Sequence, residues 1–130
     1  MRKVDDMNDK DEGVVKPRYL RVSYTGEPEA RKVLHAVRDA VQAAENSRSR
    51  SIILDLSGTA RSLSPEDRIR AGSGVAAVQS KASRRIPVAV IVPGESIDPR
   101  KVGTKAAARR GGHLNAFTTP DEARAWLRTE

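Results

Sequence analysis

Two short aliphatic runs constrain the fold of this chain most strongly. Residues 52–56 are apolar except for Asp55, and residues 88–92 are apolar throughout and are followed by Pro93 and Gly94. Runs of this length without polar alternation are typical of strands covered on both faces, as in parallel sheets. We therefore expect two neighbouring buried strands in the middle of a sheet, with helices packed against it.

The segments around these runs predict one half-buried strand, one short strand and several helices. Residues 18–24 alternate, with Leu20, Val22 and Tyr24 on one face, as in a half-covered strand. Apolar spacing, caps and glycine stops predict helices over about 28–45, 64–83 and 100–110 and after Thr119, and a short strand over 114–117. Because each connection between strands is long enough for a crossover, we expect an α/β fold with a four- or five-stranded mixed, mostly parallel sheet and about four flanking helices.

Length and composition indicate one domain with a tail. A chain of 130 residues is long enough to bury about two-thirds of its unfolded surface in one core. Residues 1–17 mix five acids with four bases and few apolar residues, so we expect a flexible tail there with at most one short edge strand. The α/β domain is then expected over residues 18–130.

Several functional classes are excluded by what the sequence lacks. There is no cysteine, which removes disulfides, thiol catalysis and thiolate-based metal sites. No apolar stretch approaches the roughly 18 residues of a membrane span, and no signal-peptide core follows the first residues. We expect a cytoplasmic protein that needs no metal or cofactor.

Four strings, taken in order, resemble the STAS-like domains, named for sulfate transporters and anti-sigma factor antagonists. They are YLRVSYTG at 19–26, IILDLSG at 52–58, VAVIVP at 88–93 and AFTTPDEARAWL at 116–127. The resemblance covers about residues 13–128 and implies a divergent, stand-alone STAS-like domain. It also implies a non-enzymatic regulatory or protein-interaction function, as in the anti-sigma antagonists. The protein partner, whose identity the resemblance does not supply, would contact residues 58–64 and the helix that follows.

Ser64 is the regulatory candidate that the resemblance supplies. Anti-sigma antagonists begin the corresponding helix with Asp-Ser-x-Gly, and a partner kinase phosphorylates the serine. Here the segment reads Leu63-Ser64-Pro65-Glu66, so only Ser64 is carried over. The residues also predict a structural role, because serine before proline and two acids is a helix N-cap.

Asp55 is a candidate catalytic nucleophile by its position after a strand. Asp55 after an aliphatic strand resembles the nucleophile loop of haloacid-dehalogenase-type phosphatases, but Ser57 stands where the second aspartate would be. Those enzymes also need a late pair of magnesium-binding acids, and Asp98 is the lone acid between Ser96 and Pro120. We therefore interpret Asp55 as a structural residue at a strand end and expect no catalytic site.

Two other patterns have structural interpretations. Residues 72–77 match a dinucleotide-binding glycine fingerprint, but they fall inside a predicted helix, where close helix–sheet packing is the better explanation. Neither His35 nor His113 has a partner at triad-like spacing, so both are expected at the surface or at a boundary.

A basic stretch supports a second functional hypothesis. The chain carries a net charge of +7, and its acid-free segment 99–120 contains Arg100, Lys101, Lys105, Arg109 and Arg110. This surface could contact nucleic-acid phosphates, although no aromatic residue is interleaved among the bases for stacking. A third hypothesis is a carrier of small apolar ligands, which the resemblance implies because some STAS-like relatives resemble lipid-binding domains.

Overall fold

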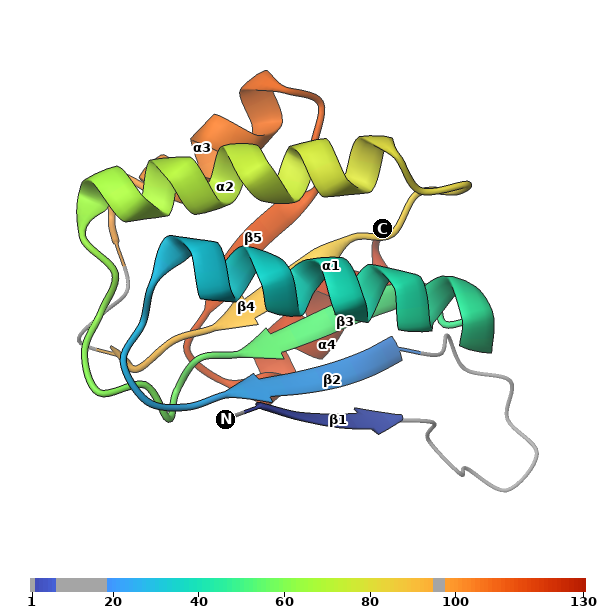
Figure 1. Ribbon diagram of the computed structural model, residues 1–130, viewed down its shortest axis with the longest axis horizontal. Coiled ribbons are helices and arrows are strands. Elements are labelled where there is room, and N and C mark those ends of the chain that lie inside the picture. The colour runs from blue at the N-terminus through green and yellow to red at the C-terminus, as the bar shows by residue number, and fades with distance from the viewer. Residues whose placement is uncertain (1, 7–18, 95–97) are drawn as a thin grey trace.

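The computed structural model describes residues 2–6, 19–94 and 98–130, and in these residues it forms one five-stranded sheet with four helices (Figure 1). The strands are β1 (Arg2–Asp6), β2 (Tyr19–Tyr24), β3 (Ser51–Asp55), β4 (Val88–Ile91) and β5 (Leu114–Phe117). The helices are α1 (Ala30–Ser47), α2 (Pro65–Ser80), α3 (Val102–Arg109) and α4 (Pro120–Arg128).

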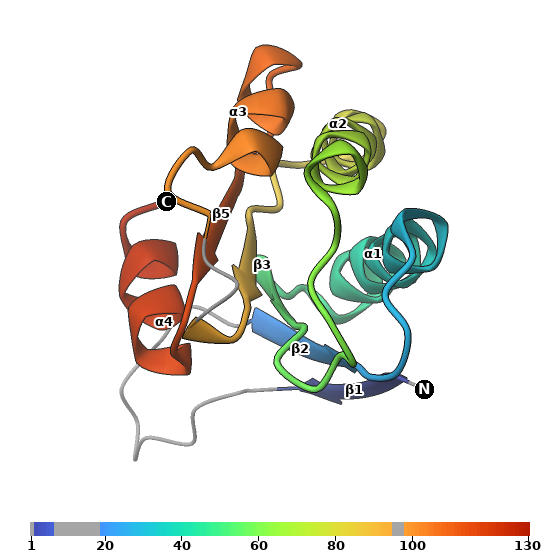
Figure 2. The ribbon, with the colours of Figure 1, turned by 90° about the vertical axis from the view of Figure 1, so that its left-hand side faces the viewer.

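The sheet has the strand order β1-β2-β3-β4-β5, with β1 antiparallel to β2 and all other neighbours parallel. Since successive parallel strands are neighbours, crossovers of one hand bring their helices to the same face. Accordingly, α1 and α2 lie on one face with α3 beside α2, whereas α4 covers the other face (Figure 2). The expected α/β, mostly parallel fold class is confirmed. Of the expected tail, Arg2–Asp6 is an edge strand, and residues 7–17 lie outside the described part.

The core has two parts, one on each face of the sheet. Leu20, Val22, Ile52 and Leu54 pack with α1 in the larger cluster, and Ile53 packs with α4 in the smaller one. All five residues of β3 are buried, as expected for a strand covered on both faces. The predicted pairing of the two aliphatic runs is confirmed, because Ile52 to Asp55 pair in register with Val88 to Ile91.

Two helix boundaries differ from the expected ones because side chains cap the backbone. We expected a helix to Ser83, but α2 ends at Ser80, and the Ser83 amide and hydroxyl instead donate to Glu45 Oε2 at 3.0 and 2.6 Å. We expected the next helix from Arg100, but α3 begins at Val102. There the carboxylate of Asp98 accepts hydrogen bonds from the backbone N–H groups of Arg100 and Val102, at 2.9 and 3.1 Å.

The glycines of α2 pack against helices, which corrects the expected helix–sheet contact. A Cβ at Gly72 would overlap the backbone carbonyl of Gly103 in α3. A Cβ at Gly74 would overlap the side chain of Leu34 in α1. The physical reason is topological: α2 lies between α1 and α3 on the same face of the sheet, so its small residues are used for lateral approach (Figure 2).

The C-terminal helix docks as expected, but on an edge strand. Ala123 and Leu127 of α4 are buried. We expected Phe117 on a buried strand, whereas all four residues of β5 are only half-buried because β5 has a neighbour on one side. The Phe117 ring packs at a tilt against Trp126, with 5.8 Å between ring centroids, and so joins the edge strand to α4.

Candidate functional site

Ser64 caps the N-terminus of α2. Its backbone is extended, and its hydroxyl oxygen accepts a hydrogen bond from the Asp67 backbone N–H at 3.2 Å. Pro65 occupies the first turn, and Glu66 and Asp67 place negative charge at the positive end of the helix dipole. The predicted helix cap is confirmed. The side chain is also exposed, so it remains accessible to a modifying enzyme.

The connection from β3 to α2 is held at its base by the loop after β2. The Ala60 amide donates to the Gly26 carbonyl at 2.8 Å, and Arg61 Nε donates to Glu27 Oε2 at 3.1 Å. Within the connection, Thr59 Oγ1 donates to the Leu56 carbonyl at 2.9 Å. These bonds fix the path of a segment whose side chains are largely exposed, so it presents a defined surface rather than an unanchored loop.

Ile69 extends this surface along α2. It is 46% exposed and is the exposed large hydrophobic residue of the described chain. Ile69 lies four residues after Pro65 and therefore on the same face of the helix, one turn further on. We call residues 58–65 together with Ile69 the β3–α2 surface.

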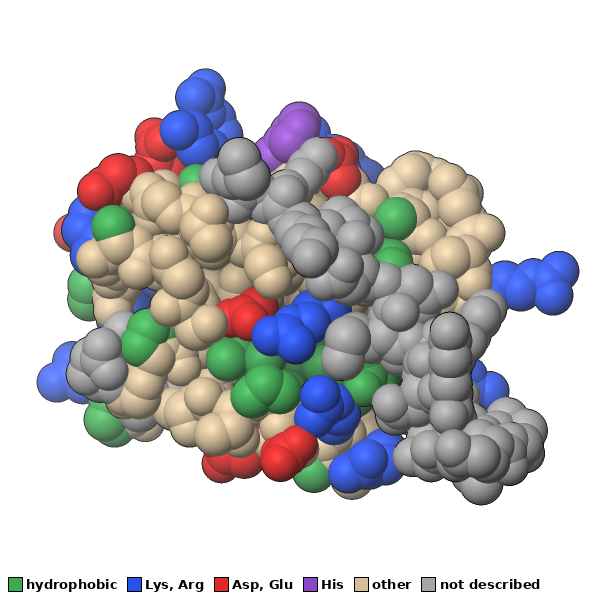
Figure 3. Space-filling view, turned by 90° about the horizontal axis from the view of Figure 1, so that it is seen from below, with side chains coloured by type: hydrophobic (Ala, Val, Ile, Leu, Met, Phe, Trp, Pro, Cys, Tyr) green, Lys and Arg blue, Asp and Glu red, His purple; other side chains and the backbone are tan. Residues whose placement is uncertain are grey.

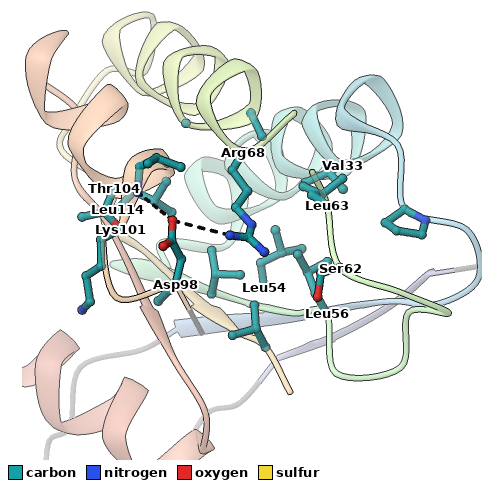
Figure 4. Close-up of a pocket in the computed structure, with 18 of the residues that line it drawn as sticks. Val33, Leu54, Leu56, Ser62, Leu63, Arg68, Asp98, Lys101, Thr104 and Leu114 are labelled. Atoms are coloured by element: carbon teal, nitrogen blue, oxygen red, sulfur yellow. Dashed lines mark hydrogen bonds and ion pairs between the residues drawn. The ribbon is translucent and has the colours of Figure 1, made fainter. Parts of the chain in front are cut away.

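A cavity of about 120 Å³ opens next to this surface, beneath α2 and α3 (Figure 4). Its floor is the buried core at the carboxyl ends of the strands, including Leu54 and Leu56 of the β3 segment and Val90 of β4. Gly72 and Gly103, where α2 and α3 touch, form part of its wall. The cavity thus lies near the carboxyl ends of β3 and β4.

Arg68 and Asp98 are the charged pair of this cavity. The Arg68 side chain comes from α2 and points toward Asp98, with its Nη1 3.5 Å from Asp98 Oδ2 (Figure 4). Hydrogen bonds from the backbone N–H groups of Val102 and Arg100 lower the pKa of Asp98, with a further contribution from Arg68. Sequence reasoning missed this pair because the two residues are far apart in the chain and belong to no motif.

The carboxylate of Asp55 is hydrogen-bonded on both oxygens, as in a residue that stabilises the fold. Its Oδ2 accepts from Arg21 Nη2 at 2.7 Å, and its Oδ1 accepts from the Ser57 amide and hydroxyl at 2.9 and 2.6 Å. Burial favours the neutral acid, but the hydrogen bonds from Ser57 and Arg21 outweigh it and lower the pKa of Asp55. Oδ2 thus joins the end of β3 to β2, and Oδ1 holds the turn that follows β3, so both oxygens have structural partners, as the sequence interpretation expected.

The residues of the basic stretch do not join Ser64 in one site. Arg100 and Lys101 precede α3, Lys105 lies along it and Arg109 and Arg110 lie at its end. Lys101 is turned to β5, where its Nζ donates to Asn115 Oδ1 at 2.9 Å and lies 5.9 Å from the Phe117 ring centroid. The other four bases have no acidic partner within the described ranges. Figure 3 shows the opposite side of the molecule, the β1 edge, where basic, acidic and apolar side chains are interspersed.

The structure brings His113 to the C-terminus of the described chain. Its Nδ1 lies 2.8 Å from Arg85 Nη2 and 3.2 Å from Glu130 Oε1. The sequence did not indicate this cluster, because its three members lie on separate segments. His35 is exposed on α1, in agreement with its expected surface position.

No group of three or more potential metal ligands is found among residues 2–6, 19–94 and 98–130. Within the same residues, no helix is long and apolar enough to cross a membrane. No protein-family model matches the chain, and no curated protein matches it. Among solved structures, the chain is similar to an anti-sigma factor antagonist from Mycobacterium paratuberculosis, with 16% identity and a TM-score of 0.48 over 98% of this chain and 96% of that one.

Proposed function

We propose that this chain is a non-enzymatic, STAS-like regulatory or interaction module that binds a protein partner through the β3–α2 surface. The observation that carries the proposal is the exposure of Ile69 beside a loop of fixed conformation at the start of α2. An exposed aliphatic side chain next to a polar loop has the composition of a small interface centre with a polar rim. The STAS-like residue strings independently predict a contact at this loop and helix.

Ser64 is proposed as the position at which this contact is regulated. A phosphate on Ser64 would lie at the N-terminus of α2, where backbone N–H groups and the helix dipole favour an anion. Glu66 and Asp67 carry charge of the same sign and would be repelled by it. The added charge would therefore alter the electrostatic character of the β3–α2 surface.

The test is capture of a partner from the cells that express the protein. Ile69→Glu is expected to reduce capture at least tenfold, because it places a charge in the centre of the contact. Ser80→Glu, at the other end of α2, is the matched control and should capture as wild type does. Ser64→Ala should cost about 1 kcal/mol of stability through loss of the cap, and Ser64→Asp should be tolerated as a cap.

The regulatory role of Ser64 has its own outcome in the same experiment. Altered capture by Ser64→Asp with normal capture by Ser64→Ala, together with a phosphorylated species in intact-mass analysis, would support it. Equal capture by both, with no phosphorylated species, would leave Ser64 as a cap. If Ile69→Glu and Ser80→Glu capture the partner equally, the β3–α2 surface is not the interface.

A second candidate function is nucleic-acid association through the basic residues around α3. It is favoured by Arg100, Lys105, Arg109 and Arg110, none of which has an acidic partner in the part of the chain that is described. Replacing both Arg109 and Arg110 by alanine should weaken DNA or RNA binding at low salt without loss of stability, since both side chains are exposed. Fluorescence anisotropy across a salt series measures this, and absence of binding by the unmodified protein would remove this candidate.

A further inference from the structure

The cavity under α2 and α3 has the size of a small-molecule site. Its volume of about 120 Å³ is close to that of an engineered apolar cavity of about 150 Å³ that stays dry and binds benzene. Most of its lining is aliphatic, with Leu54, Leu56, Val75, Val90 and Leu114 among the contributors. A ring or a chain of about six carbons would therefore fit this space and make van der Waals contact with its aliphatic lining.

Arg68 supplies a polar group at this apolar cavity. Its side chain is 26% exposed and lines the cavity, with its guanidinium turned toward Asp98 (Figure 4). A guanidinium presents five N–H donors, and the separation of 3.5 Å from Asp98 is long for a charged hydrogen bond. Asp98 already accepts two shorter bonds from the backbone at the start of α3, so it does not depend on Arg68 for its partners.

The charge at the cavity favours an anionic ligand group. Among the described residues that line it, Arg61, Arg68 and Lys101 are basic and Asp98 is acidic. Arg61 is 3.1 Å from Glu27 and Lys101 donates to Asn115 at 2.9 Å, whereas the contact of Arg68 with Asp98 is longer, at 3.5 Å, and uses one end of its guanidinium. Arg68 is therefore the basic group with donors available to a ligand. A planar carboxylate matches a guanidinium in shape and can accept two of its N–H bonds at once.

We propose that this cavity binds a small carboxylic acid whose ring or chain of about six carbons fills the aliphatic space and whose carboxylate pairs with Arg68. This inference goes beyond the proposed protein contact. The cavity shares Thr59, Arg61, Ser62 and Leu63 with the β3–α2 surface, but neither Ile69 nor Ser64, on which the proposed contact and its regulation rest, lines it. It assigns a ligand class, a small amphipathic carboxylate, to the region between the starts of α2 and α3.

The test titrates benzoate into the purified, isotope-labelled full chain and follows backbone amide signals by NMR. Saturable shifts are expected at Gly72 and Gly103, with a dissociation constant of about 1 mM for a ligand of this size. Benzyl alcohol, which has the same ring and no charge, should bind more weakly than benzoate. Arg68→Met, which keeps the aliphatic stem, should weaken benzoate about tenfold and leave benzyl alcohol unchanged.

Arg70→Met is the matched control, because Arg70 is on the same helix, is 71% exposed and does not line the cavity. It should bind benzoate as wild type does. Ala116→Leu fills the cavity from β5 and should abolish binding of both probes. The proposal is overturned if benzoate causes no saturable shift at these glycines, or if Arg68→Met and Arg70→Met bind benzoate equally. A failure of Ile69→Glu to disturb partner capture would bear on the proposed function alone.

Discussion

Gly72→Ala is expected to lower the free energy of unfolding by about 2 kcal/mol, although alanine is the better helix former. The added methyl group would overlap the carbonyl of Gly103, which is backbone in α3. No rotamer change relieves an overlap of this kind, so α2 and α3 must separate. The loss from this separation exceeds the gain of about 1 kcal/mol in helix propensity. Urea-induced unfolding followed by circular dichroism measures the difference.

Gly74→Ala is the matched control for this prediction. The overlap at Gly74 involves the end of the Leu34 side chain, which is half-buried and has rotamers available. The cost of moving the Leu34 side chain to another rotamer should approximately cancel the gain in helix propensity. The free energy of unfolding of this variant should therefore stay within about 1 kcal/mol of that of the wild type. If Gly72→Ala is as stable as Gly74→Ala, the close approach of α2 and α3 does not persist in solution. The wall of the proposed ligand cavity would then have to be revised as well.

Asp55→Ala should destabilise the fold by about 3 kcal/mol, because it removes one partner from a largely buried charge pair. The side chains of Asp55 and Arg21 are 11% and 27% exposed, and Arg21 Nε is buried without a hydrogen-bond partner. Removal of the carboxylate would leave this guanidinium with still fewer acceptors and would also leave the Ser57 amide unpaired. Partial exposure of Arg21 screens the charge and keeps the loss at the lower end of the range for buried pairs.

The same carboxylate predicts a pH dependence of stability. The pKa of Asp55 is lowered from its ordinary value of 3.8, since hydrogen bonds from Ser57 and Arg21 overcome the effect of burial. Its stabilising contribution is therefore present above the ordinary pKa and is lost as the pH falls through the lower, folded-state pKa. The stability difference between wild type and Asp55→Asn should be constant near neutral pH and shrink below about pH 4. A difference that does not change over this range would show that the charge of Asp55 contributes nothing.

The sequence alone was sufficient for the elements whose signals are local. Side-chain periodicity located the strands and helices, and the two N-caps were predicted correctly at Ser64 and Thr119, whose hydroxyls accept from the backbone three residues later. Capping, strand alternation and helix stripes depend on residues within a few positions of one another. The pairing of β3 with β4 was also predictable, because aliphatic runs of this kind, interrupted only by Asp55 in the first, are typical of central strands with both faces covered.

Tertiary structure decided the features that join distant segments. Gln79 illustrates this: its side chain bonds to the backbone of Ile86 and His113, so α2 is tied to the starts of β4 and β5, yet glutamine in a helix has no local signal for such a role. The approach of Gly72 to Gly103 and the placement of Arg68 beside Asp98 are of the same kind. The sequence determined which elements form and which residues cap them. The cavity and its charged pair exist only because the crossovers bring α2 and α3 together over the carboxyl ends of β3 and β4. The spacing of side chains along the chain does not determine how far apart two neighbouring helices lie, so this feature could not be predicted from the sequence.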